Sequence, residues 1–250
     1  MKPSTKILLM QKRLLTPIFL GSKLALWLDA ADIRTIILND STVSEWKDKS
    51  GNNRNFLQAN TVSQPRYNAT ELNGKPTLMF DGENDFLASA GWNGLISGLS
   101  GLAVFCVIKG TSGALINTSL NNGIQLSIES SGDFWINSST RVKIPFTANF
   151  DIQNYIFNAG TREVYRNGNL LQTATATPNT INTANDSLIE IGRRLWSPQF
   201  LLANVAEVLL IRGALSTIER EQLTGYFAHK WKLTANLPNN HPFKFRSPYM

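Results

Sequence analysis

The stretch that decides the fold begins with Tyr165-Arg166-Asn167-Gly168-Asn169-Leu170-Leu171 and runs on to Phe243. An Asn-Gly pair between two strand-like runs is a strong signal for a β-hairpin with a two-residue turn. Two further apolar, β-branched runs of strand length follow at 188–192 and 205–211. The C-terminal third of the chain therefore predicts a β-rich domain.

One helix is predicted to close this domain. Ser216 and Glu219 have the spacing of a capping box, in which each side chain bonds the backbone N–H of the other residue. We therefore predict one amphipathic helix over 216–231. Its apolar residues fall on one predicted buried side: Ile218, Leu223, Tyr226, Phe227 and Trp231.

Short strand-like segments separated by polar turns continue along the rest of the chain. After the first strand, the chain is expected to be loop-rich through Gly51, Asn52 and Asn53 to Pro65. At 250 residues the chain has the length of one large all-β domain, and the spacing of its segments is typical of an antiparallel sandwich. A first strand is predicted from Leu24, and further strands at 77–80, 101–109, 114–117, 123–129, 133–137, 141–146 and 154–158.

The order of these segments resembles that of concanavalin A-like, laminin-G-like jelly-roll domains, which occur as lectin-like modules in phage and bacterial surface proteins. The resemblance also rests on N-terminal segments at 24–32, 43–52, 64–67 and 80–87. It implies an all-β, two-sheet antiparallel jelly-roll sandwich with one C-terminal helix. Three tryptophans inside the family-like segments are expected in the core: Trp27, Trp46 and Trp231.

Positive charge is concentrated at the two ends of the chain. The net charge is +6, yet residues 1–23 carry five Lys or Arg without an acid, and residues 229–250 carry four. The remainder is net negative, which argues against a broad nucleic-acid-binding face. We divide the chain into a basic and apolar N-terminal arm, 1–23, and one domain, 24–250.

The arm is the predicted docking segment. Its apolar run at 7–10 ends at Gln11-Lys12-Arg13, so the pattern of a signal peptide is incomplete. Nothing in the chain approaches the roughly 18 apolar residues of a membrane span. We expect the arm to bind other virion proteins or a second copy of the chain through Ile7, Leu8, Lys12, Arg13, Ile18 and Phe19.

No catalytic constellation stands out, and the sequence predicts a protein that is not an enzyme. Glycoside hydrolysis needs two converging carboxylates, whereas Glu190 and Glu207 stand singly in separate apolar runs. We interpret each as an outward or hydrogen-bonded structural residue. The two histidines, His229 and His241, neighbour no Ser or Cys nucleophile in sequence, and His241 is interpreted as a packing residue.

No cofactor is predicted. Two His and one Cys, spread over the chain, do not make a standard zinc site, and Cys106 lies in an apolar run where a buried thiol is expected. The segment Asp81-Gly82-Glu83-Asn84-Asp85 begins like a calcium loop but lacks its later residues. It is either a tight turn or part of a calcium site between loops.

Three tryptophans beside polar turn residues are candidates for sugar binding. Sugar rings stack on aromatic faces while polar side chains bond the hydroxyls. The candidates are Trp92, Trp135 and Trp196, with Arg194 as a hydrogen-bonding partner. Plain packing in the core is the alternative for each tryptophan, because this residue is highly buried on average.

Three functional hypotheses follow from these observations. The first is a non-enzymatic virion structural or attachment protein, such as a phage head decoration, fibre or tail component docked by its arm. The second is a carbohydrate-binding lectin module of a bacterial surface or secreted protein, with a host-surface glycan as partner. A glycan-active enzyme is a third hypothesis, weakened by the missing carboxylate pair.

Overall fold

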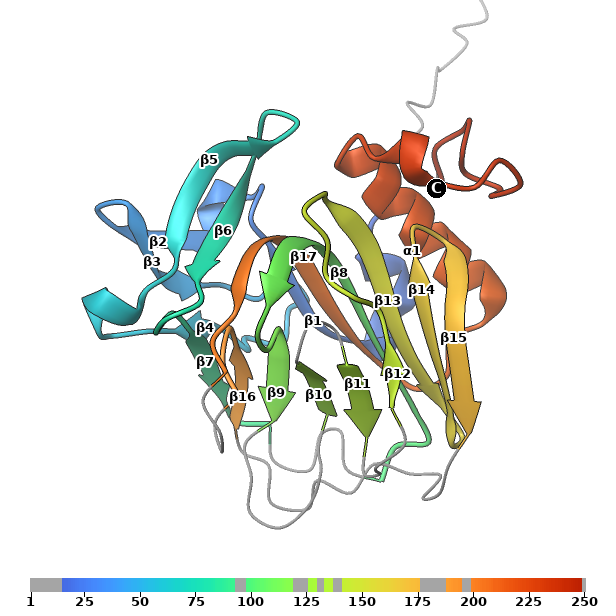
Figure 1. The fold of residues 1–250 in the computed structure, drawn as a ribbon, viewed down its shortest axis with the longest axis horizontal. Coiled ribbons are helices and arrows are strands. Elements are labelled where there is room, and N and C mark those ends of the chain that lie inside the picture. Colours follow the sequence, from blue (N-terminus) through green and yellow to red (C-terminus); the bar gives the residue numbers. More distant parts are fainter. Residues whose placement is uncertain are drawn as a thin grey trace, which may run out of the picture.

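The computed structural model describes residues 15–92, 98–118, 126–129, 133–136, 141–175, 188–194 and 199–248, and all structural statements concern these ranges. The strands pair antiparallel and form one continuous sheet that folds into two layers (Figure 1). One α-helix packs on the outside. This architecture confirms the predicted jelly-roll fold with a single C-terminal helix.

The first layer contains the longer strands and is called the long-strand layer. Its order is β15-β14-β13-β8-β17, and β17 pairs on its far side with both β1 and β6, the latter joined to β5. The strands are β1 (Leu24–Asp29), β5 (Arg66–Leu72), β6 (Lys75–Asp81), β8 (Gly101–Ser112), β13 (Asp151–Asn158), β14 (Thr161–Arg166), β15 (Asn169–Thr175) and β17 (Leu202–Arg212).

The second layer is called the short-strand layer. Its order is β12-β11-β10-β9-β16-β7-β4-β3-β2. One pairing, Thr42 with Arg66, joins it to the first layer. The strands are β2 (Ile36–Asn39), β3 (Thr42–Trp46), β4 (Phe56–Leu57), β7 (Leu87–Ala90), β9 (Ile116–Thr118), β10 (Leu126–Glu129), β11 (Asp133–Ile136), β12 (Val142–Lys143) and β16 (Leu188–Ile191).

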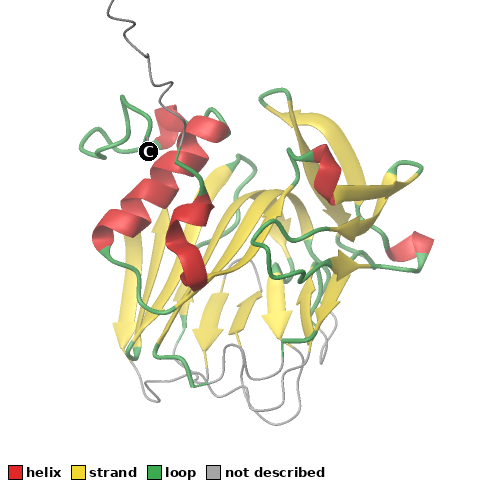
Figure 2. Cartoon of the chain, turned by 180° about the vertical axis from the view of Figure 1, so that it is seen from behind, coloured by secondary structure: helices red, strands yellow, loops and turns green. Residues whose placement is uncertain are grey.

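Helical elements cover the outer face of the long-strand layer (Figure 2). The α-helix α1 spans Thr217–Lys230, and the short helix η1 (Pro17–Lys23) contacts β1 and β17. Three further short 3-10 helices lie in connections: η2 (Ile33–Thr35), η3 (Thr61–Ser63) and η4 (Thr234–Asn236). None of the helices within the described ranges has the length and hydrophobicity to span a membrane.

Two apolar clusters hold the layers together, and the alternation of strand side chains explains both. In β8, Leu102, Val104 and Cys106 face the cluster between the layers, whereas Phe105 and Val107 face the cluster beneath α1. The central strands β8 and β17 are therefore buried on both faces, which is why their sequences read as continuous apolar runs. Cys106 is fully buried, as predicted.

The hairpin and the helix cap form as the sequence predicts. Asn167 and Gly168 both have positive φ, 51° and 86°, which the turn between β14 and β15 requires. At the start of α1, the Ser216 Oγ accepts a hydrogen bond from the Glu219 backbone N at 3.2 Å, and the Glu219 carboxylate accepts one from the Ser216 backbone N at 2.8 Å. Trp27, Trp46 and Trp231 are all core residues.

Two predictions about local structure are wrong. Ile218 is 68% exposed instead of buried, because it stands in the first turn of α1, before the helix reaches the sheet. The predicted loop-rich region also contains β2, β3 and β4, and the polar strand β5 follows it. β4 and β5 escape detection because β4 has only two residues and β5 carries mostly exposed polar side chains.

The second half of the predicted arm lies on the chain's own domain. Leu15 and Leu20 are buried, Phe19 packs against the cluster beneath α1, and Lys23 bonds the Glu219 carboxylate at 2.7 Å. Ile18 stays 62% exposed. Ile7, Leu8, Lys12 and Arg13 lie outside the described residues, so their predicted docking role stays a prediction.

Candidate functional site

A transverse row of paired residues crosses the short-strand layer. Successive cross-strand partners along it are Leu57 (β4), Ala88 (β7), Glu190 (β16), Asn117 (β9), Ser127 (β10) and Trp135 (β11). Flanking residues in these strands, among them Phe56, Leu87, Ile189 and Ile191, belong to the cluster between the layers. Because side chains alternate along a strand, the side chains of Ala88, Glu190 and Asn117 lie on the outer face of the layer.

The centre of the row is a fixed ion pair. Glu190 is buried, and its carboxylate bonds both Nη2 of Arg193, at 2.5 Å, and Nε, at 3.2 Å. The Arg193 guanidinium lies over the Phe86 ring, 3.5 Å from its centroid. The fork-to-carboxylate geometry and the ring fix the guanidinium in one plane.

Arg193 can still reach a ligand. Its side chain is 22% exposed, and a guanidinium has more N–H donors than the two that Glu190 uses. Leu57, at the end of the row, is 53% exposed, and Ala88 is half-buried with a small side chain. The arrangement offers oriented hydrogen-bond donors beside a shallow apolar strip, the chemistry that polyhydroxylated ligands need. We call Phe86, Ala88, Glu190 and Arg193 the arginine site.

The predicted sugar-binding tryptophans separate in the structure. Trp135 stands in the same transverse row as Glu190, three strands further along. With strands about 4.8 Å apart, the backbones of the two residues are roughly 14 Å apart. Trp92 is fully buried in the core beneath the Arg54 guanidinium, so packing describes it and its proposed stacking role is corrected. Trp196 lies outside the described residues.

The structure separates the two adjacent arginines by exposure, and a sugar-binding role of Arg194 stays a prediction. Arg194 is 8% exposed, and its backbone N donates to the Gln199 carbonyl at 3.2 Å. The neighbouring Arg193 has the more accessible guanidinium. Its signal was present in the sequence, since Glu190 and Arg193 are three residues apart at the end of a strand, but only the turn after Ile191 brings them together.

The second buried carboxylate, Glu207, belongs to a structural network beneath α1. Its Oε1 accepts hydrogen bonds from Trp27 Nε1 at 2.6 Å and Tyr226 Oη at 2.8 Å. Its Oε2 accepts from Trp231 Nε1 at 2.6 Å and Lys230 Nζ at 2.7 Å. Burial raises the pKa of Glu207, whereas Lys230 opposes that rise.

Glu190, Glu207 and both histidines form hydrogen bonds within the fold. Glu190 and Glu207 stand in different layers, and both are hydrogen-bonded, as the sequence interpretation had it. His229 bonds the Phe243 carbonyl through Nε2 at 2.8 Å and Ser247 Oγ through Nδ1 at 3.0 Å. Burial lowers the pKa of His241 to about 4, and its Nδ1 accepts from the Phe243 backbone N.

The acidic segment after β6 forms a tight turn. Asp81 Oδ1 accepts hydrogen bonds from the backbone N of Glu83 at 2.8 Å and of Asn84 at 3.2 Å, so this oxygen is used by the turn itself. Within the described ranges, no group of three His, Cys, Asp or Glu residues is placed to hold a metal ion. The turn alternative describes this segment, and calcium binding stays an untested hypothesis.

Asp85 at the end of this turn predicts a pH dependence of stability. Burial, reinforced by the Asp81 carboxylate, raises the pKa of Asp85 to about 7, above the roughly 3.9 of an unfolded chain. The folded state therefore binds this proton more tightly, and stability falls as pH rises from about 4 to about 7. Replacing Asp85→Asn should remove this loss. The melting temperature of the variant should therefore rise relative to that of the wild type as the pH increases from 5 to 8.

The matched control is Asp40→Asn, which changes an exposed aspartate in the turn between β2 and β3. Its melting temperature should run parallel to that of the wild type over the same pH range. Parallel profiles for Asp85→Asn as well would contradict the buried carboxyl as their cause.

No family model matches the chain, and no curated protein matches it. Solved structures do. Domain 4 of AbnA, an extracellular GH43 arabinanase from Geobacillus stearothermophilus solved with arabinotriose, superposes with a TM-score of 0.55 at 18% identity, covering 79% of this chain and 96% of that one. The receptor-binding domain of botulinum neurotoxin D gives 0.58 at 12% identity, covering 82% and 53%.

The binding domain of Paraclostridial Mosquitocidal Protein 1 gives a TM-score of 0.58 at 16% identity, covering 83% of this chain and 53% of that one. The chain thus spans about half the length of the two toxin domains and nearly all of the arabinanase domain. These matches define the fold as the concanavalin A-like jelly roll that the sequence resemblance implied.

Proposed function

We propose that this protein is a lectin-like, glycan-binding module and that the arginine site is part of its binding surface. The observation that carries the proposal is the Glu190–Arg193 pair. It holds a partly exposed guanidinium flat on Phe86, on the outer face of a sheet where Trp135 occupies the same row. Sugar hydroxyls accept hydrogen bonds from such a group, and neighbouring apolar surface takes the C–H face of the ring.

The comparisons support the proposal through the fold. The arabinanase domain was solved with arabinotriose, and one matching structure carries a title about botulinum neurotoxin C and ganglioside molecules, at a TM-score of 0.53 and 14% identity. The titles of both structures name a carbohydrate-containing ligand: arabinotriose for the first and gangliosides for the second. A glycan-binding module acts where polysaccharides are displayed, so a cell surface or the extracellular space is the proposed location.

The virion hypothesis gains no argument from the fold or from the comparisons. Its main support in the sequence was a free arm, and residues 15–23 of that arm contact their own domain. A docking role for residues 1–14 stays a prediction. The proposed function therefore follows the lectin hypothesis.

A glycan array followed by calorimetry tests the proposal. We expect at least one oligosaccharide to bind, with arabinotriose and gangliosides included as probes. Arg193→Ala should weaken binding tenfold or more, because a hydrogen bond to a charged group contributes about 1.5–3 kcal/mol. Trp135→Ala should weaken binding of the longer glycans only, given its roughly 14 Å separation from the pair.

Arg34→Ala is the matched control. Arg34 also pairs with a carboxylate, that of Asp32 at 2.8 Å, but its side chain is 85% exposed and belongs to η2. It should bind like the wild type. An array without hits at millimolar ligand, or an Arg193→Ala variant that is folded and binds equally well, would overturn the proposal.

A further inference from the structure

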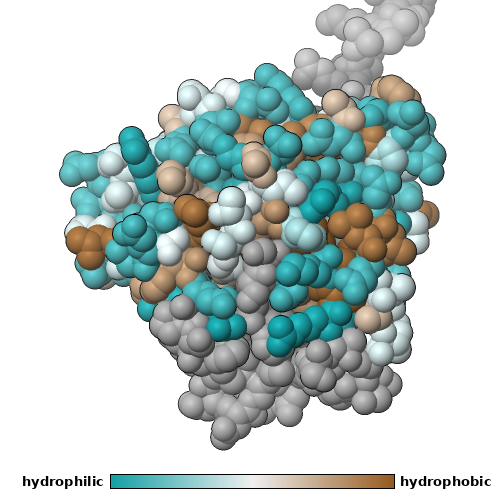
Figure 3. Space-filling model, viewed as in Figure 1, coloured by the Kyte–Doolittle hydropathy of each residue, from teal (hydrophilic) through white to brown (hydrophobic). Residues whose placement is uncertain are grey.

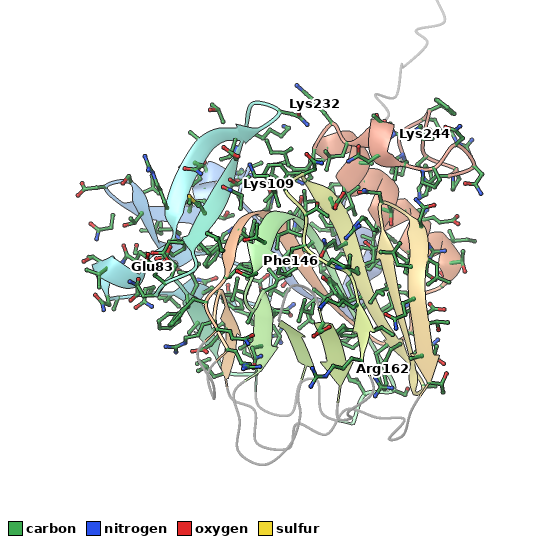
Figure 4. All side chains as sticks on the ribbon, viewed as in Figure 1. Glu83, Lys109, Phe146, Arg162, Lys232 and Lys244 are labelled. Carbon is green, nitrogen blue, oxygen red and sulfur yellow. The ribbon has the colours of Figure 1, made fainter. Side chains whose placement is uncertain are left out.

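A pocket of about 240 Å³ opens beside β6, β17 and β8, away from the arginine site. Met79, Asn204 and Lys109 pair across these three strands in one row. Lys109 lies near the end of β8, between β6 and β13 (Figure 4). The volume is below the 300–1,000 Å³ of pockets for drug-sized ligands, so it suits one functional group or one ring.

Small residues leave this space open. Gly110 and Ala203 pair in the adjoining row and line the pocket. They approach so closely that a Cβ added to Gly110 would lie 2.5 Å from the Ala203 Cβ. Leu202, which is 40% exposed, and Ala148 complete a mainly apolar wall. An apolar group of methyl size therefore finds contacts on several sides.

The polar groups of the pocket favour a neutral hydrogen-bond acceptor. Asn204 Oδ1 accepts hydrogen bonds from Asn68 Nδ2 and Thr77 Oγ1, both at 3.1 Å, which turns its Nδ2 donors away from these partners. Lys109 Nζ pairs with the Glu71 carboxylate. That pairing neutralises the local charge, so a carboxylate ligand gains little, whereas a carbonyl oxygen can accept from the amide of Asn204.

We propose that this pocket binds the acetamido group of an N-acetylated sugar, with the methyl group against Met79, Leu202 and Ala148 and the carbonyl oxygen toward Asn204. An acetamido group combines a small apolar end with a neutral acceptor, which is the combination that the pocket presents. The proposal rests on the proposed function in that both assume a glycan ligand, but the pocket is separate from the arginine site.

Saturation-transfer NMR on the full chain tests the site with two matched pairs of probes. N-acetylglucosamine should show transfer to its acetyl methyl group and bind at least tenfold more tightly than glucose. N-methylacetamide should bind more tightly than acetate. Equal binding within the sugar pair, or preference for acetate, would overturn the acetamido assignment.

Ala148→Phe fills the pocket from an exposed loop and should lower the affinity for N-acetylglucosamine tenfold or more. Ala235→Phe, an equally exposed alanine in η4, should leave it unchanged. Unchanged binding in a folded Ala148→Phe variant would overturn the site. Should that variant fail to fold, amide shifts of Gly110, Ala203 and Asn204 on titration of the wild type decide the question, and their absence overturns it.

The arginine-site variant separates this proposal from the proposed function. Arg193→Ala should bind N-acetylglucosamine as the wild type does, because Arg193 does not line the pocket. A parallel loss of both activities in Arg193→Ala would mean one shared site and would overturn the pocket as a separate one.

Discussion

Replacing Glu207→Ala is expected to lower the free energy of unfolding by about 3–5 kcal/mol, because it leaves three buried donors without an acceptor and each unsatisfied donor costs about 1–3 kcal/mol. Glu207 is fully buried, and its carboxylate is the shared acceptor for Trp27, Tyr226, Trp231 and Lys230. Without it, three buried donors lose their acceptor: Trp27 in β1, Tyr226 in α1 and Trp231 at the C-cap of α1. A loss of this size is a large part of the 5–15 kcal/mol typical of a folded domain.

Glu207→Ala also tests the wider network of ion pairs, because Lys230 connects Glu207 to Asp29. Its Nζ also bonds Asp29 Oδ1 at 2.6 Å, and Asp29 Oδ2 in turn bonds Lys49 Nζ at 2.7 Å. The ion pairs therefore tie α1 to β1 and to the segment after β3. Because Lys230 keeps one carboxylate, the expected loss comes mainly from the aromatic donors and the empty acceptor position.

Denaturant unfolding measures the effect. Trp27→Phe is a milder variant that keeps most of the ring and removes one donor, and about 1 kcal/mol is expected from it. Glu83→Ala, at an exposed turn, should stay within about 0.5 kcal/mol of the wild type. A Glu207→Ala variant within 1 kcal/mol of the wild type would show that the network does not hold α1 on the sheet.

The second large effect is expected at Gly113, where the chain passes from β8 in one layer to β9 in the other. Its φ is +96°, and an added Cβ would lie 2.0 Å from the Phe200 carbonyl oxygen and 2.5 Å from the Leu201 Cα. Both contacts are with backbone, which cannot rotate away. Gly113→Ala should therefore destabilise the domain by more than about 4 kcal/mol, in the exceptional range for point mutations.

A second glycine provides the control. Gly213 also has a left-handed φ, +83°, but an added Cβ there meets nothing within 4 Å. Gly213→Ala should cost only the roughly 1–2 kcal/mol of the left-handed conformation. Soluble expression and urea unfolding compare the two variants, and equal losses would contradict the steric explanation for Gly113.

The outer surface bears on solubility in these experiments. Figure 3 shows a mostly polar face in this view, with an apolar patch over β15, where Leu170 and Leu171 are about half exposed. Among the strands that the structure describes, β15 has β14 as its pairing partner. An edge strand with exposed leucines can pair with the same strand of a second copy. Because such self-association would distort the unfolding curves, the measurements are best made at low protein concentration.

Local signals in the sequence determined much of the fold. The Asn167-Gly168 turn, the capping box at Ser216 and Glu219, and the apolar run of β8 each act within a few residues. Their conformations are set by backbone sterics and side-chain hydrogen bonds over short distances. The same locality explains why the short strand β4 and the polar strand β5 were not found: their pairing partners, not their own residues, make them strands.

The site depended on contacts that only the tertiary structure decides. The sequence placed sugar binding on three tryptophans and Arg194, yet Trp92 and Arg194 are buried and Arg193 is the accessible arginine. Which tryptophan lies in the core follows from how two layers close over each other, and which strands lie side by side follows from long-range register. Residues 57, 88, 190, 117 and 135 share one row because strands far apart in sequence pair there. Propensity and periodicity act along the chain, whereas register and burial are set across it.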